Sequence, residues 1–117
     1  MSTPSSRKAP TVTQIGSNGS AAQTSVSNGD KIQWQAPQQS TAWVNPPNIF
    51  VGGCATGNVI KLKPGEIGPN PACVVSHKPG SFQYGCGIGD PPVPPLFTDG
   101  GEIIIVDGKG HKDKKHY

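Results

Sequence analysis

The chain has few charged, aromatic or apolar residues, and it has a single methionine. Charged residues make up 15% of its 117 residues, aromatic residues 6% and hydrophobic residues 32%. The low charge argues against a disordered polyelectrolyte, and the small apolar share indicates one domain with a thin core.

No apolar run reaches the ~18 residues that a membrane-spanning helix needs. The start of the chain also lacks the apolar stretch of a signal peptide. The expected compartment is therefore periplasmic or secreted if a leader was removed, and cytoplasmic otherwise.

Cysteine is scarce as well, with three residues at positions 54, 73 and 86. An odd number allows at most one internal disulfide and leaves one thiol over. None of the three forms a CxxC pair, which argues against a structural zinc site. The pairs closest in sequence are Cys54 with Cys73 and Cys73 with Cys86, and spacing alone does not choose between them.

The sequence shows no recognisable catalytic motif. Cys86 as a nucleophile would need a base such as His77 within hydrogen-bond reach, and nothing in the sequence brings the two together. The glycine-rich segment 52–58 lacks the Lys-Ser/Thr ending of a phosphate-binding loop. No two acidic residues have a spacing that suggests a catalytic carboxylate pair. We therefore do not expect an enzyme, and we expect a structural role for Cys86.

Glycine and proline are abundant, with 16 and 13 residues, and they alternate with short apolar runs. This pattern predicts an all-β domain of seven to eight short strands joined by long loops, in a sandwich or barrel. Alternation of apolar and polar residues points Ile32 and Trp34 inward, and likewise Phe82, Tyr84 and Cys86. The run 103–106 is continuously apolar, which predicts burial on both faces. The expected strands are residues 11–15, 24–27, 31–35, 49–51, 58–62, 72–75, 81–86 and 102–106.

The net charge of +3 comes largely from the two ends of the chain. Residues 1–9 are interpreted as a flexible arm, 10–108 as the domain and 109–117 as a basic, flexible tail. A basic tail can attract an anionic partner, so an anion-binding adaptor is one alternative function. Nucleic acid is not the expected partner, because a solvated tail explains the same charge.

Three segments, in this order, resemble the cupredoxins. Residues 27–34 (SNGDKIQW) are similar to that family's Gly-Asp turn before a strand with an inward Trp. Residues 78–86 (KPGSFQYGC) are similar to its Pro-Gly turn, aromatic strand and copper-ligand Cys. Residues 101–106 (GEIIIV) are similar to its closing strand. The resemblance implies a Greek-key β-sandwich of the plastocyanin and azurin type.

In that family two His, one Cys and a weak axial Met hold copper. Here only Cys86 falls on a ligand position, because the loop 35–45 has no His and the loop 87–97 has neither His nor Met. A lone thiolate does not hold copper against competing thiols. We therefore expect a non-catalytic, cupredoxin-like binding or structural module without a type 1 copper site and without a cofactor. The copper alternative is an electron-transfer protein with an atypical site formed by Cys86 and His77.

Long loops at the end of a sandwich commonly carry recognition residues. Trp43 stands in a polar, proline-rich stretch that reads as a loop, and a second proline-rich loop contains Pro92 and Leu96. A large aromatic residue in a loop is either a contact residue or a plug. Trp43, Pro92 and Leu96 are thus the predicted partner-binding residues. The sequence leaves the partner itself unknown, with a protein as one candidate class.

Overall fold

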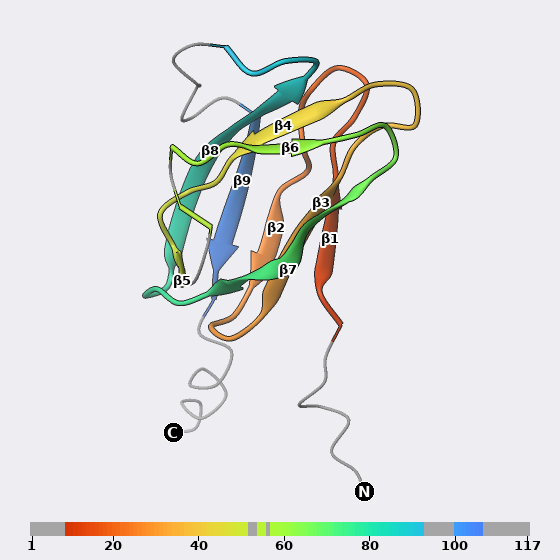
Figure 1. The fold of residues 1–117 in the computed structure, drawn as a ribbon. Helices are drawn as coiled ribbons and strands as arrows, with labels where there is room; N and C mark the ends of the chain where they lie inside the picture. Colours follow the sequence, from red (N-terminus) through yellow and green to blue (C-terminus); the bar gives the residue numbers. More distant parts are fainter. Residues whose placement is uncertain (1–8, 52–53, 56, 93–99, 107–117) are drawn as a thin grey trace, which may run out of the picture.

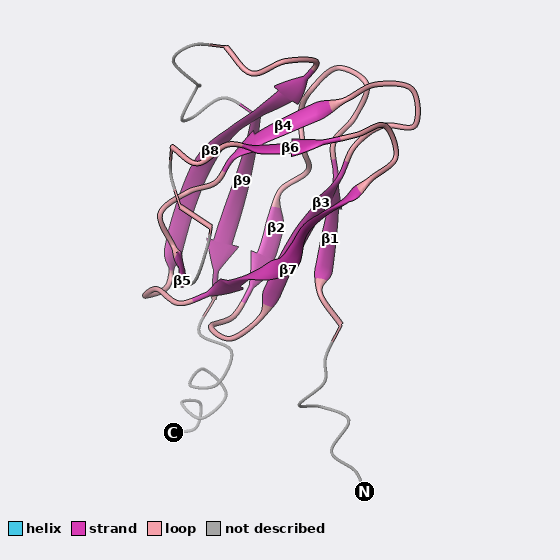
Figure 2. Cartoon of the chain, viewed as in Figure 1, coloured by secondary structure: helices cyan, strands magenta, loops and turns pink. Residues whose placement is uncertain are grey.

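A computed structural model describes residues 9–51, 54–55, 57–92 and 100–106, and these residues form nine strands and no helix (Figures 1 and 2). This confirms the all-β prediction. Nor does this part of the chain hold a helix that could span a bilayer. The predicted arm (apart from residue 9) and the basic tail lie outside the described residues. The strands are β1 (Thr11–Gln14), β2 (Thr24–Val26), β3 (Lys31–Gln35), β4 (Ala42–Asn45), β5 (Phe50–Val51), β6 (Ile60–Leu62), β7 (Ile67–Val75), β8 (Gly80–Ile88) and β9 (Gly100–Ile105).

The strands form two sheets that pack into a β-sandwich. One sheet has the order β1-β3-β7-β5 and the other the order β2-β9-β8-β4-β6. Most strand pairs are antiparallel, whereas β1 runs parallel to β3 and β2 runs parallel to β9. The chain changes sheet at every connection from β1 to β8, and only β8 and β9 are consecutive neighbours within one sheet (Figure 1).

The predicted alternation places the core where the sequence indicated. Ile32 and Trp34 of β3 are fully buried, and so is Tyr84 of β8, which belongs to the other sheet. Removing a large apolar side chain from water contributes about 1.5–3 kcal/mol, so these residues are the main stabilising contacts of a small core. Gly29, in the turn between β2 and β3, has φ +90°, a conformation that side chains rarely adopt.

One disulfide joins Cys54, in the segment after β5, to Cys73 of β7. Their Cα atoms are 5.7 Å apart, within the range that a disulfide spans. Of the two pairings that the spacing left open, the structure therefore has the first. Cys86 stays outside the disulfide and is buried on β8.

Two expectations about strand positions are wrong. Trp43 does not stand in a loop: it lies on β4, which pairs with β8 on one side and β6 on the other. The closing strand is not buried on both faces, because Ile104 is half-buried and Val106, just beyond β9, is 43% exposed. Its outer face is partly exposed, since no further layer among the described residues covers this strand.

Strand β7 is longer than predicted and runs through Pro69 and Pro71. Proline is tolerated where one side of a strand has no partner, and β5 pairs only with Val74 and Val75 of β7. Where the ladder between β3 and β7 is irregular, the amide of Gln33 donates to the Pro69 carbonyl at 2.9 Å. A side chain thus replaces main-chain pairing at this point.

Candidate functional site

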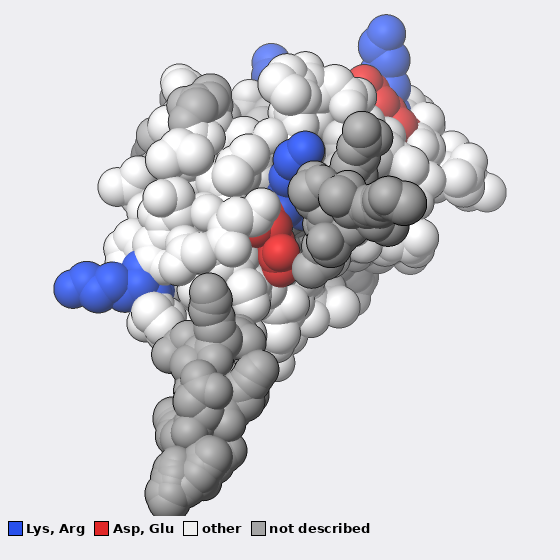
Figure 3. All heavy atoms as spheres, turned by 90° about the horizontal axis from the view of Figure 1, so that it is seen from below, with Lys and Arg blue, Asp and Glu red and all other residues white. Residues whose placement is uncertain are grey.

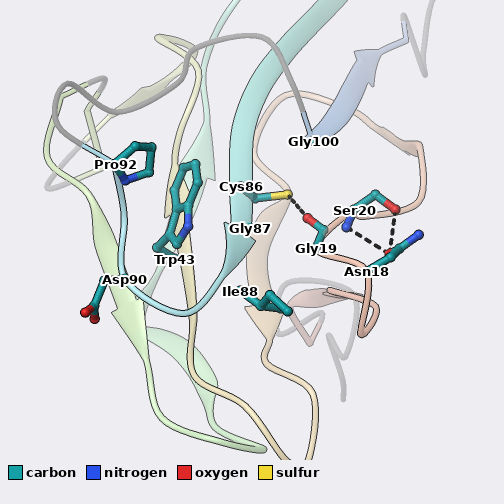
Figure 4. Close-up of a pocket in the computed structure, with 10 residues that line it drawn as sticks. All are labelled: Asn18, Gly19, Ser20, Trp43, Cys86, Gly87, Ile88, Asp90, Pro92 and Gly100. Atoms are coloured by element: carbon teal, nitrogen blue, oxygen red, sulfur yellow. Dashed lines mark hydrogen bonds between the residues drawn. The ribbon is translucent and has the colours of Figure 1, made fainter.

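A pocket of about 360 Å³ opens beside the last residues of β8, and it contains the predicted site residues Cys86, Trp43 and Pro92 (Figure 4). Its wall combines the β1–β2 loop, Trp43 of β4, the end of β8, the segment after β8 and the start of β9. Sequence reasoning missed most of this wall, although it read Asn18-Gly19 as a turn. The lining residues are Asn18, Gly19, Ser20, Trp43, Cys86, Gly87, Ile88, Asp90, Pro92 and Gly100.

The Cys86 thiol lies on the inner side of the sheet, and 5% of the residue is exposed. It donates a hydrogen bond to the Gly19 carbonyl, with 3.4 Å between sulfur and oxygen. A Cβ at Gly100 would come within 2.6 Å of the same sulfur. Glycine at position 100 is therefore required for β9 to pack against Cys86.

Trp43 lies on the opposite face of the same sheet. Its partner across the strands is Gly87, and a Cβ at Gly87 would stand 2.9 Å from the indole nitrogen. The indole thus covers a glycine, as aromatic residues often do in designed sheets. Trp43 is 3% exposed, yet it is not part of the continuous hydrophobic core. It is buried on the outer face of the sheet, where Figure 4 shows it beside Pro92.

Among the residues that the structure describes, the Trp43 indole N–H has no hydrogen-bond acceptor. The other indole, that of Trp34, donates to the Tyr84 hydroxyl at 2.9 Å. Buried donors are satisfied in the great majority of cases. Within the described residues Trp43 is an exception, and it lines the pocket.

The structure does not bring His77 to Cys86. The His77 ring packs against Phe82, near the beginning of β8, with 4.8 Å between ring centroids. Its backbone exchanges two hydrogen bonds with the Asn28 side chain. Phe82 precedes Cys86 by four residues, which is about 13 Å along a strand. Leu96, the third predicted partner-binding residue, lies outside the described residues.

Around the pocket the structure provides few charges. Asp90 is the only carboxylate among its described lining residues, and that lining contains no Lys, Arg or His. Figure 3 shows lysines that stand apart on one face of the molecule rather than gathering in a patch. A second hollow of about 310 Å³, beside β6, is lined by charges of both signs: Lys61, Lys63, Glu66 and Asp90. The described residues contain no group of three His, Cys, Asp or Glu that could hold a metal ion.

Two ionisable side chains have perturbed pKa values. Burial raises the pKa of Tyr84 far above its usual value, an effect that the Trp34 hydrogen bond opposes and the neighbouring Cys86 reinforces. The pKa of the exposed Glu102 is lowered, because its carboxylate accepts hydrogen bonds from the Ser81 hydroxyl and the Gln23 amide. Neither group lines the pocket.

Comparison with known proteins adds no relative: no protein-family model, no curated protein and no solved structure matches the chain. The sandwich and its pocket are therefore the observations from which function can be argued.

Proposed function

We propose that this protein is a non-catalytic, cupredoxin-like binding module that holds no type 1 copper. The fold part of the proposal is supported by the resemblance of three segments to the cupredoxins and by the two-sheet sandwich in which they lie. Its connections alternate between the sheets from β1 to β8, which is compatible with a Greek-key arrangement.

The observation that carries the functional part is the environment of Cys86, the residue on the copper-ligand position of the resemblance. A type 1 site needs two imidazoles and a thiolate in one plane, with a weak axial ligand. The described wall around Cys86 supplies one thiol, which donates a hydrogen bond to the Gly19 carbonyl, and it supplies no imidazole or thioether. His77, the candidate second ligand, lies near the other end of β8. These residues do not fit the copper ion.

A binding role rests on the pocket itself. Its volume lies at the lower end of the range of ligand pockets. Its lining combines apolar side chains (Trp43, Ile88 and Pro92) with polar ones (Asn18, Ser20 and Asp90). Two of the three predicted partner-binding residues, Trp43 and Pro92, meet there. We propose that the partner contacts the molecule at this end of the sandwich.

A copper titration of the reduced, metal-free protein tests the negative half of the proposal. We expect neither stoichiometric binding of Cu(I) or Cu(II) nor an intense thiolate-to-copper absorption band. A coloured one-to-one complex that is absent from Cys86→Ala would overturn the proposal and favour the electron-transfer alternative. The same titration of His77→Ala shows whether His77 is a ligand in such a complex, because losing a ligand would weaken or abolish the absorption band.

A further inference from the structure

The chain contains two Asn-Gly sequences, Asn18-Gly19 and Asn28-Gly29, and both asparagines are exposed and lie in turns. An asparagine followed by glycine is open to spontaneous deamidation, because glycine has no side chain to hinder attack of its backbone nitrogen on the asparagine amide. The two asparagines have the same local sequence but different hydrogen bonds, and these bonds predict different reactivity.

The side chain of Asn18 is bonded within its own turn. Its carbonyl oxygen Oδ1 accepts two hydrogen bonds from Ser20, from the backbone N–H at 3.1 Å and from the hydroxyl at 3.0 Å (Figure 4). Because Ser20 follows Gly19, the first bond folds the amide of Asn18 back over its own peptide bond, toward the Gly19 nitrogen. Negative charge builds up on Oδ1 during the attack, and both bonds strengthen with that charge.

The side chain of Asn28 is bonded to a distant part of the chain. Its amide group donates to the His77 carbonyl at 2.8 Å, and its carbonyl accepts from the His77 N–H at 2.7 Å. The Gly29 N–H donates to the carbonyl of Val75, the last residue of β7, at 2.9 Å. Deamidation removes both the amide group and the Gly29 proton, so here it breaks two tertiary hydrogen bonds.

We propose that Asn18 is a site of spontaneous deamidation that Ser20 promotes, and that Asn28 is protected. The Gly19 nitrogen forms a bond to Cγ of Asn18, the bond from Cγ to Nδ2 breaks, and ammonia leaves with the Gly19 proton. Water then opens the succinimide ring. Cleavage at Cγ gives aspartate, and cleavage at the main-chain carbonyl gives isoaspartate. The net reaction consumes one water and releases one ammonia, without oxidation or reduction.

This modification lies beyond the proposed binding function and does not depend on it, but it changes the same pocket. Asn18 and Gly19 line the pocket, and the Gly19 carbonyl accepts the hydrogen bond of the Cys86 thiol. Either product adds a carboxylate to a lining that already holds Asp90. Isoaspartate also adds one carbon to the main chain directly before Gly19, which displaces the carbonyl from the thiol.

Peptide mapping of aged protein tests the proposal. Folded protein is incubated at mildly alkaline pH and digested with pepsin in acid, and its peptides are separated and identified by mass spectrometry. We expect Asn18 to convert roughly tenfold or more faster than Asn28, because Asn28 must lose its tertiary hydrogen bonds. Both aspartate and isoaspartate should form. Equal conversion of the two sites, or faster conversion of Asn28, would overturn the proposal.

Exposure of the two glycines predicts the opposite order, since Gly29 is exposed and Gly19 is buried. The mapping therefore separates the effect of the hydrogen bonds from that of exposure. In urea the two rates should converge, because the unfolded chain keeps only the shared Asn-Gly sequence. A difference that persisted in urea would refute the structural cause.

Variants test the role of Ser20. Ser20→Ala removes the hydroxyl donor and should slow deamidation of Asn18 roughly twofold to tenfold, the effect of one hydrogen bond. Ser17→Ala, exposed in the same turn, should leave the rate unchanged. The urea unfolding midpoint of each variant shows that it is folded. A rate in Ser20→Ala at or above that of the wild type would contradict activation by Ser20.

Reaction with a thiol reagent tests the effect on Cys86. The deamidated fraction, separated from the unmodified protein by ion exchange, should show a fast phase whose amplitude equals its isoaspartate content. Freshly purified Asn18→Asp carries the charge without the extra carbon and should lack this phase. A deamidated fraction that reacted no faster than Asn18→Asp would contradict the displacement of the Gly19 carbonyl.

Discussion

The indole nitrogen of Trp34 donates a hydrogen bond to the hydroxyl of Tyr84 at 2.9 Å, and this bond joins the two sheets through the core. Trp34 lies on β3 and Tyr84 on β8, fifty residues apart, and both side chains are fully buried. Their rings also meet edge to face, with centroids 5.6 Å apart. The polar atoms of the two largest core residues thus satisfy each other where water has no access.

Tyr84→Phe should destabilise the protein by about 1–3 kcal/mol, because the Trp34 N–H would stay buried without its acceptor. Urea unfolding followed by tryptophan fluorescence measures the change. The matched control is Gln83→Ala, an exposed neighbour on β8, which should stay within about 0.5 kcal/mol of the wild type. Equal stability of Tyr84→Phe and the control would show that the bond contributes nothing net.

The raised pKa of Tyr84 predicts a loss of stability at alkaline pH. The unfolded chain releases the phenol proton near pH 10, whereas burial keeps it on the folded protein to a higher pH. The unfolded state then binds fewer protons, so the free energy of unfolding falls above about pH 10 by up to about 1.4 kcal/mol per pH unit. Tyr84→Phe removes this contribution and should show a shallower decline.

The tyrosinate absorption of the wild type minus that of Tyr84→Phe isolates this residue from Tyr117, the second tyrosine. We expect the difference spectrum to appear only with unfolding. Ionisation near pH 10 in the folded protein would contradict the buried environment of the hydroxyl.

Glu102 should titrate below its usual pKa, chiefly because the Ser81 hydroxyl donates to its carboxylate and secondarily because the Gln23 amide does. A depressed folded-state pKa contributes stability that is present above the unfolded pKa and is lost as the pH falls through the folded one. Ser81→Ala should raise the pKa of Glu102, as measured by carboxyl NMR titration. Gln83→Ala is the control, since Gln83 lies opposite Glu102 in the sheet. A larger shift in the control would refute the assigned cause.

The Cys54–Cys73 disulfide closes a loop with a sequence separation of 19 residues. In the chain-entropy model, a loop of this length contributes about 3 kcal/mol. The double variant Cys54→Ala/Cys73→Ala should lose about that amount in urea unfolding. Thiol counting provides the second check: the folded protein should react slowly because Cys86 is buried, and the unfolded, unreduced protein should show one thiol. A count of three before reduction would exclude the disulfide.

Local signals predicted much of the fold. The alternation in residues 31–35 identified β3 with the bounds that the structure has, and it named Ile32 and Trp34 as inward-facing. The same reasoning placed Tyr84 and Cys86 on one face of β8. These predictions succeeded because strand geometry turns successive side chains to opposite faces. Burial of one face therefore appears in the sequence as apolar residues at every second position.

The candidate site was only partly predictable. Trp43 and Pro92 were singled out, but the segment around Trp43 has polar and proline neighbours and reads as a loop. It becomes strand β4 because β8 and β6 pair with both its edges, and its indole is buried because Gly87, opposite it, leaves room. Both facts depend on residues distant in the chain.

The sequence by itself determined that the protein is all-β, that Ile32, Trp34 and Tyr84 form part of its core, and that one disulfide at most is available. Only the tertiary structure decided that Cys54 forms a disulfide with Cys73 and that the Cys86 thiol donates a hydrogen bond to the Gly19 carbonyl. It also decided that Trp43 is buried beside a pocket, where no described residue accepts a hydrogen bond from its N–H. The physical reason is the distance along the chain over which each interaction acts. Alternation and turn preferences act between neighbours in the chain, whereas a disulfide and an indole packed over a glycine depend on which strands meet in space.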